Sequence, residues 1–263
     1  MSIQAVRMGL IFIIPHLFLV FIPSTFSWTN LLILFVSYYL SIFGLSIGYH
    51  RYLCHKGFTC GPILKFILLS LGAFGFQGSP LIWRAVHTVH HLHTDTDKDP
   101  HSPVRGFWFS YYLWLMDEKN IPDPKEHAKD YLGDRMVMFM DKYYAVWVLA
   151  SLLIPYLLFG WEGLIWGGFL RMVFVRHMTS IVSSVGHMGK VSRNTKEKHQ
   201  GVNSFLLALL LSGDGWHQNH HDDEDRVRHG IKWWQIDVTW YVVCLLEKLG
   251  LVWNIKGKTP RQP

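Results

Sequence analysis

Hydrophobic residues are grouped along the chain in blocks long enough to cross a lipid bilayer. A membrane-spanning helix needs about 20 mostly apolar residues. Four segments come close to this length, at residues 8–26, 31–49, 144–159 and 164–185. Two short turns, "PSTFSWTN" and "GWEG", join them in pairs. The pattern predicts an all-α integral membrane protein with four transmembrane helices.

Ionisable residues occur inside two of these segments. His16 lies in the first, and Arg171, Arg176 and His177 lie in the fourth. Such side chains usually face the interior of a helix bundle or a wet cavity. A further apolar segment, 62–76, is short and contains glycine, so it fits an interfacial or re-entrant helix better than a full crossing.

The positions of lysine and arginine predict the orientation. The two pairwise turns contain none, whereas residues 50–143 and 186–263 contain nearly all of them. Because cytoplasmic loops carry the excess of positive charge, both termini and these two segments are expected on the cytoplasmic side. We therefore expect one membrane domain over residues 1–263, in which segments 50–143 and 186–263 form a cytosolic helical cap.

The N-terminal segment has the general shape of a signal peptide. It lacks a convincing small-residue cleavage site, and a second apolar segment follows at once, so a retained hairpin of two spans is the better interpretation. The C-terminal part alternates between apolar and polar residues with a helical period, as in an amphipathic helix that packs on the rest of the cap.

Composition narrows the class of protein further. Half of the residues are hydrophobic, and the formal net charge is +6. No basic helix or RNA-type aromatic motif organises this charge, so we attribute it to membrane sidedness and expect no nucleic-acid partner. The three cysteines are too few and too scattered for a disulfide framework or a thiolate metal site.

Histidines form three groups with the spacing of metal ligands. Residues three and four apart share one face of a helix, so each HxxHH motif presents two or three imidazoles to one point in space. The groups are "HRYLCH" (His50, His55), "HTVHH" (His87, His90, His91) and "HQNHH" (His217, His220, His221), and His187 is a further candidate.

The number of these histidines indicates the kind of site. Imidazole binds iron, zinc, copper and nickel, so the ligand type alone does not identify the metal. Eight or nine histidines are too many for one tetrahedral zinc but suit two ions of higher coordination number. Two irons can activate dioxygen to attack an unactivated C–H bond, and a mouth in the membrane would admit a lipid chain.

Less specific interpretations were weighed against this one. A lone HxxHH motif often occurs by chance on a polar helix face, but two copies beside an HxxxxH motif on one side of a membrane bundle favour a metal site. The carboxylates of "DTDKDPH" and "HHDDEDR" either orient ligand imidazoles or cap helices and face solvent. The remaining histidines lack ligand spacing and are interpreted as satisfied or solvated side chains, with His93 and His101 behind the ligands or at the surface.

Several stretches resemble the membrane fatty acid desaturases of the Δ9, stearoyl-CoA desaturase type. They are "GYHRYLCHKGF", "FQGSPLIWRAVHTVHHLHTDTDKDPHSPVRGFWFS", "GDGWHQNHH" and "EKLGLVWNIK", in family order, with wording most similar to bacterial and cyanobacterial members. The resemblance implies a four-span bundle with a cytosolic cap, two iron ions, O2 as oxidant, and insertion of a cis double bond, at Δ9, into a long-chain acyl group linked to CoA or to a glycerolipid.

The resemblance also implies roles for particular residues. A family asparagine with a water-mediated metal contact is replaced here by Ser183, and Gln77 and Trp83 correspond to positions that line the acyl tunnel. Ala85 and Val86 stand where animal acyl-CoA enzymes have an Arg-Asp pair. No catalytic residue beyond the metal centre is implied. The implied metal ligands are His50, His55, His87, His90, His91, His187, His217, His220 and His221.

The chain shows no heme or flavin motif, so the electrons are expected from a separate protein, a ferredoxin or a cytochrome b5. The resemblance favours a multi-pass location in a bacterial inner membrane over the endoplasmic reticulum. Two other functions stay open. A membrane di-iron lipid hydroxylase or ketolase shares the chemistry and differs in its product, whereas a non-catalytic membrane metal-binding protein would place its ligands at mid-bilayer.

Overall fold

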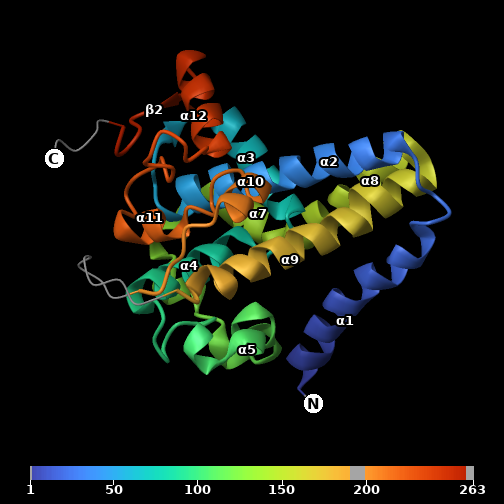
Figure 1. Ribbon diagram of the computed structural model, residues 1–263, viewed down its shortest axis with the longest axis horizontal. Coiled ribbons are helices and arrows are strands. Elements are labelled where there is room, and N and C mark those ends of the chain that lie inside the picture. The colour runs from blue at the N-terminus through green and yellow to red at the C-terminus, as the bar shows by residue number, and fades with distance from the viewer. Residues whose placement is uncertain (1, 190–198, 259–263) are drawn as a thin grey trace.

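A computed structural model of the chain describes residues 2–189 and 199–258, and it is mostly helical (Figure 1). The strands β1 (Thr59–Cys60) and β2 (Val252–Trp253) form a short antiparallel pair. The α-helices are α1 (Ile3–Leu17), α2 (Trp28–Phe43), α3 (Pro62–Phe74), α4 (Pro80–His93), α5 (Phe107–Tyr111), α6 (Pro124–His127), α7 (Arg135–Lys142), α8 (Tyr144–Gly163), α9 (Arg171–Ser183), α10 (Phe205–Leu210), α11 (His217–Asp222) and α12 (Val238–Lys248). Helical segments of the 3-10 type are Phe18–Phe21, Pro103–Arg105, Leu113–Met116, Glu118–Asn120, Lys129–Tyr131 and Val185–His187, and segments of the π type are Gly44–Cys54 and Leu164–Leu170.

Three helical runs in the described part of the chain are long and apolar enough to cross a membrane, namely Ile3–Phe21, Trp28–Cys54 and Tyr144–His187. The first run begins before the expected 8–26, because the Ser2 hydroxyl accepts a hydrogen bond from the backbone N–H of Ala5 at 3.1 Å and caps α1. The second run exceeds the expected 31–49, because Ser27 caps α2 and a π-type segment continues α2 to Cys54.

The third run folds back on itself. Its 44 residues would extend about 66 Å as one straight helix, roughly twice the thickness of the bilayer core. Gly160 interrupts it with φ 65° and ψ −150°, a conformation that only glycine adopts readily. At Gly163 an added Cβ would lie 2.1 Å from the carbonyl oxygen of Pro155, so the two limbs pack closely. The break falls between the predicted segments 144–159 and 164–185, and α8 and α9 lie side by side (Figure 1).

Arg171 in α9 is buried, as expected for an arginine inside a span, and it clamps four helices together. Its guanidinium donates hydrogen bonds to the hydroxyl oxygens of Ser41 in α2 (3.2 Å) and Ser151 in α8 (2.9 Å). It also donates to the carbonyl oxygen of Phe74, the last residue of α3. These bonds hold the short apolar helix α3 against the bundle.

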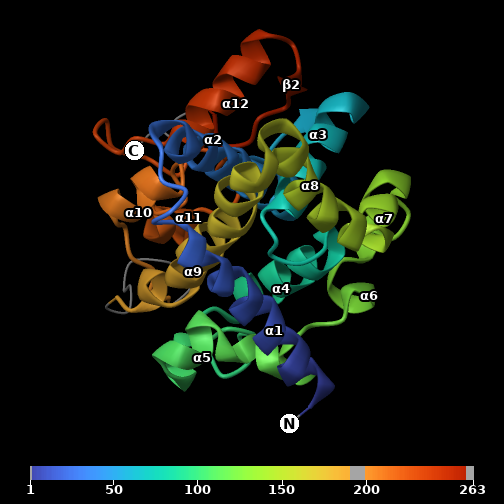
Figure 2. The same cartoon turned by 90° about the vertical axis from the view of Figure 1, so that its right-hand side faces the viewer.

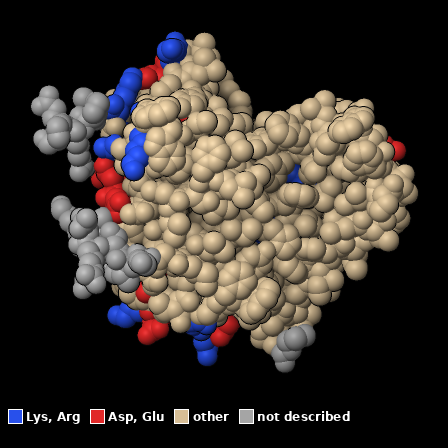
Figure 3. Space-filling view, viewed as in Figure 1, with Lys and Arg blue, Asp and Glu red and all other residues tan. Residues whose placement is uncertain are grey.

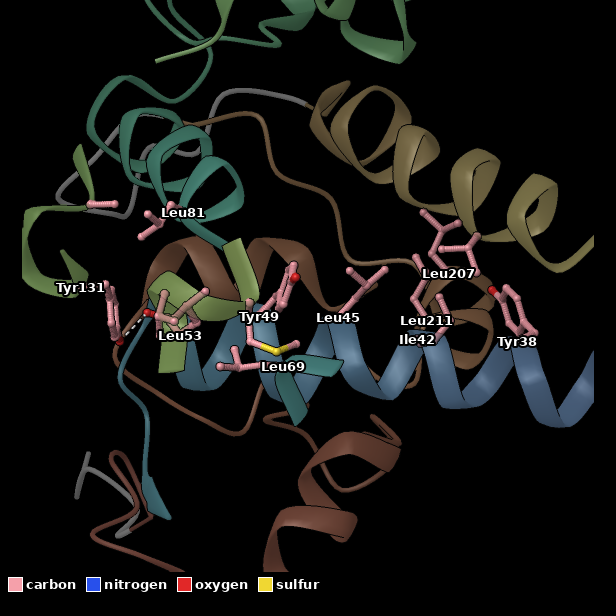
Figure 4. Packing of buried hydrophobic residues seen from close by; sticks show 14 residues of the cluster. Tyr38, Ile42, Leu45, Tyr49, Leu53, Leu69, Leu81, Tyr131, Leu207 and Leu211 are labelled. Atoms are coloured by element: carbon pink, nitrogen blue, oxygen red, sulfur yellow. Dashed lines mark hydrogen bonds between the residues drawn. The ribbon is translucent and has the colours of Figure 1, made fainter. Parts of the chain in front are cut away.

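The end of the second run that carries His50 is fixed by apolar packing. Leu45, Tyr49 and Leu53 are buried in one cluster, and the Tyr131 hydroxyl donates a hydrogen bond to the carbonyl oxygen of Leu53 at 2.9 Å (Figure 4). The cluster includes residues from α3, α4 and the α10 region, namely Leu69, Leu81, Leu207 and Leu211. Segments far apart in the sequence are therefore held around this helix end.

Helix α1 contacts α9 and the π-type segment Leu164–Leu170, and it passes in front of α4 and α9 in Figure 2. The Tyr112 hydroxyl donates to the carbonyl oxygen of Met8 at 2.6 Å, and the Gln4 amide donates to that of Leu115 at 3.0 Å. Most of the outer face of α1 is exposed and apolar. On the face shown in Figure 3, charged residues gather at the end that carries α11 and α12 and near α5, whereas the opposite end is almost free of them.

Candidate metal centre

A π-type helical segment brings the two histidines of the HxxxxH motif, His50 and His55, onto the same side of the chain. Residues Gly44–Cys54 have π-type spacing, and the backbone N–H of His55 donates to the carbonyl oxygen of His50 at 3.1 Å, five residues earlier. Because residues five apart then lie about one turn apart, the two imidazole rings approach to 4.9 Å between centroids. The π-type segment therefore lets both histidines face one point.

Helices α4 and α11 divide their histidines in a complementary way. On α4, His87 and His91 face one cluster of imidazoles while His90 faces another. On α11, His217 and His221 share a cluster while His220 joins the opposite one. Residues four apart lie on the same helix face, so each HxxHH motif contributes a pair to one cluster and a single ligand-type side chain to the other.

All nine histidines singled out in the sequence are thus brought together in two groups. The five-histidine cluster contains His50, His55, His87, His91 and His220, and the four-histidine cluster contains His90, His187, His217 and His221. Within each cluster the candidate ligand nitrogens all lie within 4.8 Å of one another.

The donor set fits a metal ion in each cluster. The Nε2 atoms of neighbouring imidazoles face each other at short range, for example 3.1 Å between His50 and His220 and 3.2 Å between His217 and His221. Nitrogen ligands of one ion, each bound at roughly 2.1 Å, lie about 3.0 Å apart when they occupy neighbouring octahedral positions. Lone pairs at this distance repel unless a proton or a cation lies between them, and a cation satisfies all of them at once.

Carboxylates stand behind several of these imidazoles. The Nδ1 atom of His90 lies 2.9 Å from Asp99 Oδ2, and that of His91 lies 3.0 Å from Glu224 Oε2. His187 Nδ1 lies 3.0 Å from an oxygen of Asp95. A carboxylate that accepts a hydrogen bond from Nδ1–H keeps the proton on that nitrogen, so Nε2 is unprotonated and directed at the metal position. Of the two interpretations of the acidic stretches, orientation of an imidazole therefore applies to Asp99, which is hydrogen-bonded to His90, whereas Glu224 and Asp95 lie at ion-pair distance from their imidazoles.

Burial keeps seven of the nine imidazoles in the neutral form that metals require, namely those of His55, His87, His90, His91, His217, His220 and His221. It lowers the pKa of His90 to about 3, although Asp99 opposes the shift. Burial, followed by the proximity of other histidines, holds the pKa values of His87 and His217 well below their usual range. Burial alone would raise the pKa of Asp99, but the attraction of His90 and then of His101 lowers it, so the carboxylate stays ionised.

A buried network of charges supports the five-histidine cluster. Arg51 donates hydrogen bonds to Asp214 at 3.1 Å and to Asp237 at 3.0 Å. Asp214 in turn lies 3.5 Å from His50 Nδ1 and 3.4 Å from His229 Nδ1. The sequence interpretation missed this network. Its one available signal was the position of Asp214 in "GDGWH", three residues before a candidate ligand.

Two adjoining cavities reach the clusters. An inner cavity of about 120 Å³ is lined by His50, His90, His187 and His217 together with apolar side chains of α2 and α9. An outer cavity of about 730 Å³ lies between α1, α4 and α9. Both include Trp83, His87, His101, Thr179 and Ser183 in their walls. The shared wall residues therefore place the outer cavity next to the inner one, which borders both histidine clusters.

The two residues expected in the acyl tunnel, Gln77 and Trp83, and the one expected to hold a metal-bound water, Ser183, lie along these cavities. Trp83 and Ser183 line both of them, and Gln77 lines the outer one. The Ser183 hydroxyl also donates to the carbonyl oxygens of Ser110 and Ser180. Val86 lines the outer cavity, whereas Ala85 is fully buried.

The other histidines lie outside the two clusters. The imidazoles of His16 and His177 contact each other at 2.9 Å between α1 and α9. His199 lies 2.9 Å from a carboxylate oxygen of Asp222, and His127 and His93 are half-buried. His101 is half-buried beside His90, with 4.5 Å between the ring centroids, and it also borders both cavities.

The described part of the chain is mostly helical, has helical runs long and apolar enough to cross a membrane, and places two histidine clusters that could each hold a metal ion beside a cavity with mainly apolar walls. The family model for fatty acid desaturases matches residues 26–250. The chain is 38% identical over 246 residues to an acyl-CoA C20 Delta5-desaturase of Anemone leveillei, covering 92% of this chain and 78% of the relative.

It is also 37% identical to two relatives named sn-1 stearoyl-lipid 9-desaturase. The relative from Anabaena variabilis matches over 245 residues, 92% of this chain and 89% of its own length. The relative from Synechocystis matches over 243 residues, 90% of this chain and 75% of its own length. The chain belongs to the fatty acid desaturase family and is an oxidoreductase, as the resemblance in the sequence implied.

Proposed function

We propose that this protein is an O2-dependent di-iron desaturase that inserts a cis double bond at the Δ9 position of a long-chain acyl group on CoA or a glycerolipid. The observation that carries the proposal is the pair of histidine clusters beside the inner cavity. The two relatives named sn-1 stearoyl-lipid 9-desaturase support the Δ9 position and a glycerolipid-linked substrate. The relative named acyl-CoA C20 Delta5-desaturase supports CoA as the other acyl carrier.

The five-histidine cluster would hold one iron and the four-histidine cluster the other. Ser183, which lines the inner cavity beside three histidines of the smaller cluster, would hold a water that completes that iron's ligands. When bound, the irons supply the reduction of O2 that makes removal of unactivated C–H hydrogens feasible. The carboxylates behind the imidazoles keep each Nε2 directed at its ion.

The protein's own residues position the acyl chain. Gln77 and Trp83 line the route from the outer cavity, and apolar residues such as Leu45 and Leu211 receive the chain in the inner cavity. Two adjacent carbons then face the histidine clusters, and each loses one hydrogen. O2 takes up four electrons, two from these C–H bonds and two from the donor. With the two hydrogens of the substrate and two protons from solvent, it leaves as two molecules of water. Since a misplacement of about 1 Å can cost on the order of 100-fold in rate, cavity shape sets the position of the double bond.

We further propose four membrane crossings, formed by the first two apolar runs and the two limbs of the third. The length of the third run and its reversal at Gly160 support this count. The gathering of charged residues at the histidine-bearing end supports a cytoplasmic location for that end (Figure 3). The chain would then be a single domain over residues 1–263 with a cap at 50–143 and 186–263, in a bacterial inner membrane.

The electrons would come from a separate ferredoxin or cytochrome b5. The side chain of Glu224 is 55% exposed and contacts His91, so it joins the five-histidine cluster to the surface. Lys56 and Lys256 are exposed close by, and the Lys256 ammonium donates to the carbonyl oxygen of His55 at 3.0 Å. This arrangement supports docking of a partner with an acidic face.

The test is the lipid profile of a host that lacks its own desaturase and expresses this chain with a compatible donor. Monounsaturated acyl chains, located by gas chromatography and mass spectrometry, are expected with the intact chain. They should be absent with His217→Ala and present with His93→Ala, which alters the same residue type outside the clusters. Hydroxylated or keto chains would overturn desaturation in favour of a hydroxylase or ketolase, and iron-loaded protein without any product would favour a metal-binding protein.

A further inference from the structure

Helix α12 is apolar on two opposite faces. Its inner face packs Val243, Trp240 and Leu246 into an apolar cluster. Its outer face exposes Tyr241 and Leu245, and Leu249 is exposed directly after the helix; the two leucines are 55% and 63% exposed. A helix that faces water normally presents polar residues there, whereas a helix that is apolar all round is covered by something else.

The apolar surface continues on both sides of α12. The preceding segment exposes Trp233, at 91%, beside Trp234, and the following segment exposes Leu251 and Trp253. Single exposed apolar side chains are common on protein surfaces, but a continuous patch marks an interaction site. Tryptophans at the edge of such a patch are typical of the membrane interface.

The patch is joined to the apolar helix α3. Thr59 pairs with Trp253 in the β1–β2 ladder, and α3 begins directly after β1. Helix α3 exposes Ile63, at 78%, together with Phe66 and Ile67. Figures 1 and 2 show α3 and α12 at the same end of the molecule. The exposed surface therefore runs from a helix already expected at the membrane interface to the C-terminal helix.

Basic side chains border the patch. The Lys232 ammonium lies 5.7 Å from the ring centroid of Trp234, and Lys248 is exposed on α12. The acidic residue of α12, Glu247, forms an ion pair with Lys258 at 2.6 Å. Lysines place their alkyl chains along apolar surface and direct their charge outward, where anionic head groups attract it.

We propose that α12, the 231–236 segment, β2 and α3 form a collar that lies in the head-group region of the bilayer, and that its occupant is a leaflet containing anionic lipid. The inference rests on the membrane crossing proposed above. It assigns the C-terminal part of the cap to the membrane interface instead of to bulk water. The collar holds the histidine-bearing end of the protein at a constant depth.

Spin labels at single cysteines test the depth of the collar in vesicles of phosphatidylcholine and phosphatidylglycerol. The background carries Cys60→Ser and Cys244→Ser and keeps Cys54, which is buried. Labels are placed at Leu245→Cys and Trp233→Cys in the collar, at Leu157→Cys on the exposed face of α8, and at Glu126→Cys as the water control. Two collar positions are used so that one misfolded variant does not decide the result.

Collisions with O2 should exceed those with a water-soluble nickel chelate at positions 157, 245 and 233, and the reverse is expected at 126. Removal of phosphatidylglycerol should shift the collar labels toward water and leave position 157 unchanged. Collar labels that match position 126 would overturn the collar alone, whereas a water-exposed label at 157 would overturn the proposed crossing. If labels at position 245 were shielded from both reagents and showed dipolar coupling between two molecules, the patch would instead be an interface with a second copy of the chain.

Discussion

His90 Nδ1 lies 2.9 Å from Asp99 Oδ2, and both side chains are buried beside the four-histidine cluster. Asp99 also accepts hydrogen bonds from the backbone N–H groups of Asp95 and His101. The carboxylate is therefore fixed by its own loop and in turn fixes the tautomer and ring orientation of His90. The acidic loop after α4 is thus part of the candidate metal centre.

Asp99→Asn should weaken metal binding with little loss of folded protein. An amide is a poorer acceptor than a carboxylate for the His90 N–H, and loss of such partners typically costs 10-fold to 100-fold in metal affinity. The measurement is the iron retained against a graded chelator. Asp97→Asn is the matched control, because Asp97 is exposed on the same loop. Equal retention by the two variants would contradict an orienting role for Asp99.

Acidification should destabilise the metal-free protein. Burial, and then neighbouring imidazoles, hold the pKa values of His87, His217 and His221 well below the usual value. In the unfolded chain these residues take up protons below about pH 6.5, whereas in the folded chain they do not until lower pH. The unfolded state therefore binds more protons, and stability falls as the pH falls below about 6.5.

The midpoint of thermal denaturation in detergent, measured from pH 8 to pH 5, checks this direction. The triple variant with glutamine at these three positions should show a flatter dependence on pH. A midpoint that rises on acidification, or an equal slope in the triple variant, would contradict the assignment of the effect to the clustered histidines.

Because the two limbs of the third apolar run pack closely, replacing Gly163 with a larger residue should destabilise the folded protein. A Cβ there would lie 2.1 Å from the carbonyl oxygen of Pro155, so Gly163→Ala must displace backbone and should cost about 1–3 kcal/mol of stability. Gly9→Ala is the control, because a Cβ at that position meets no atom within 4 Å. Thermal denaturation of both variants in detergent measures the difference. Equal midpoints would argue against the close contact between the two limbs.

Sequence patterns predicted the long apolar helices and the histidine set, because hydrophobic runs and HxxHH spacing are local properties of the chain. They did not predict that the segment around His50 has π-type spacing, which depends on packing against α3. The network of Arg51 with Asp214 and Asp237 joins residues more than 160 positions apart, so local patterns indicated nothing of it beyond the position of Asp214 before His217. Nor did spacing show that His90 and His91, adjacent in sequence, face different clusters.

The placement of His90 and His91 in different clusters gives the most specific prediction of the proposed di-iron centre. His91→Ala should impair the five-histidine cluster and keep the other, whereas His90→Ala should do the opposite. His93→Ala, on the same helix but outside both clusters, should leave both intact. The two sites differ in the number of imidazoles, so they should be distinguishable by spectroscopy.

Mössbauer spectroscopy of the protein reconstituted with iron-57 under reducing conditions is the most direct test. The intact chain is expected to show two ferrous quadrupole doublets of equal area. His91→Ala should lose one doublet, His90→Ala should lose the other, and His93→Ala should retain both. A single doublet in the intact chain, or loss of the same doublet in both ligand variants, would contradict the assignment of one iron to each histidine cluster.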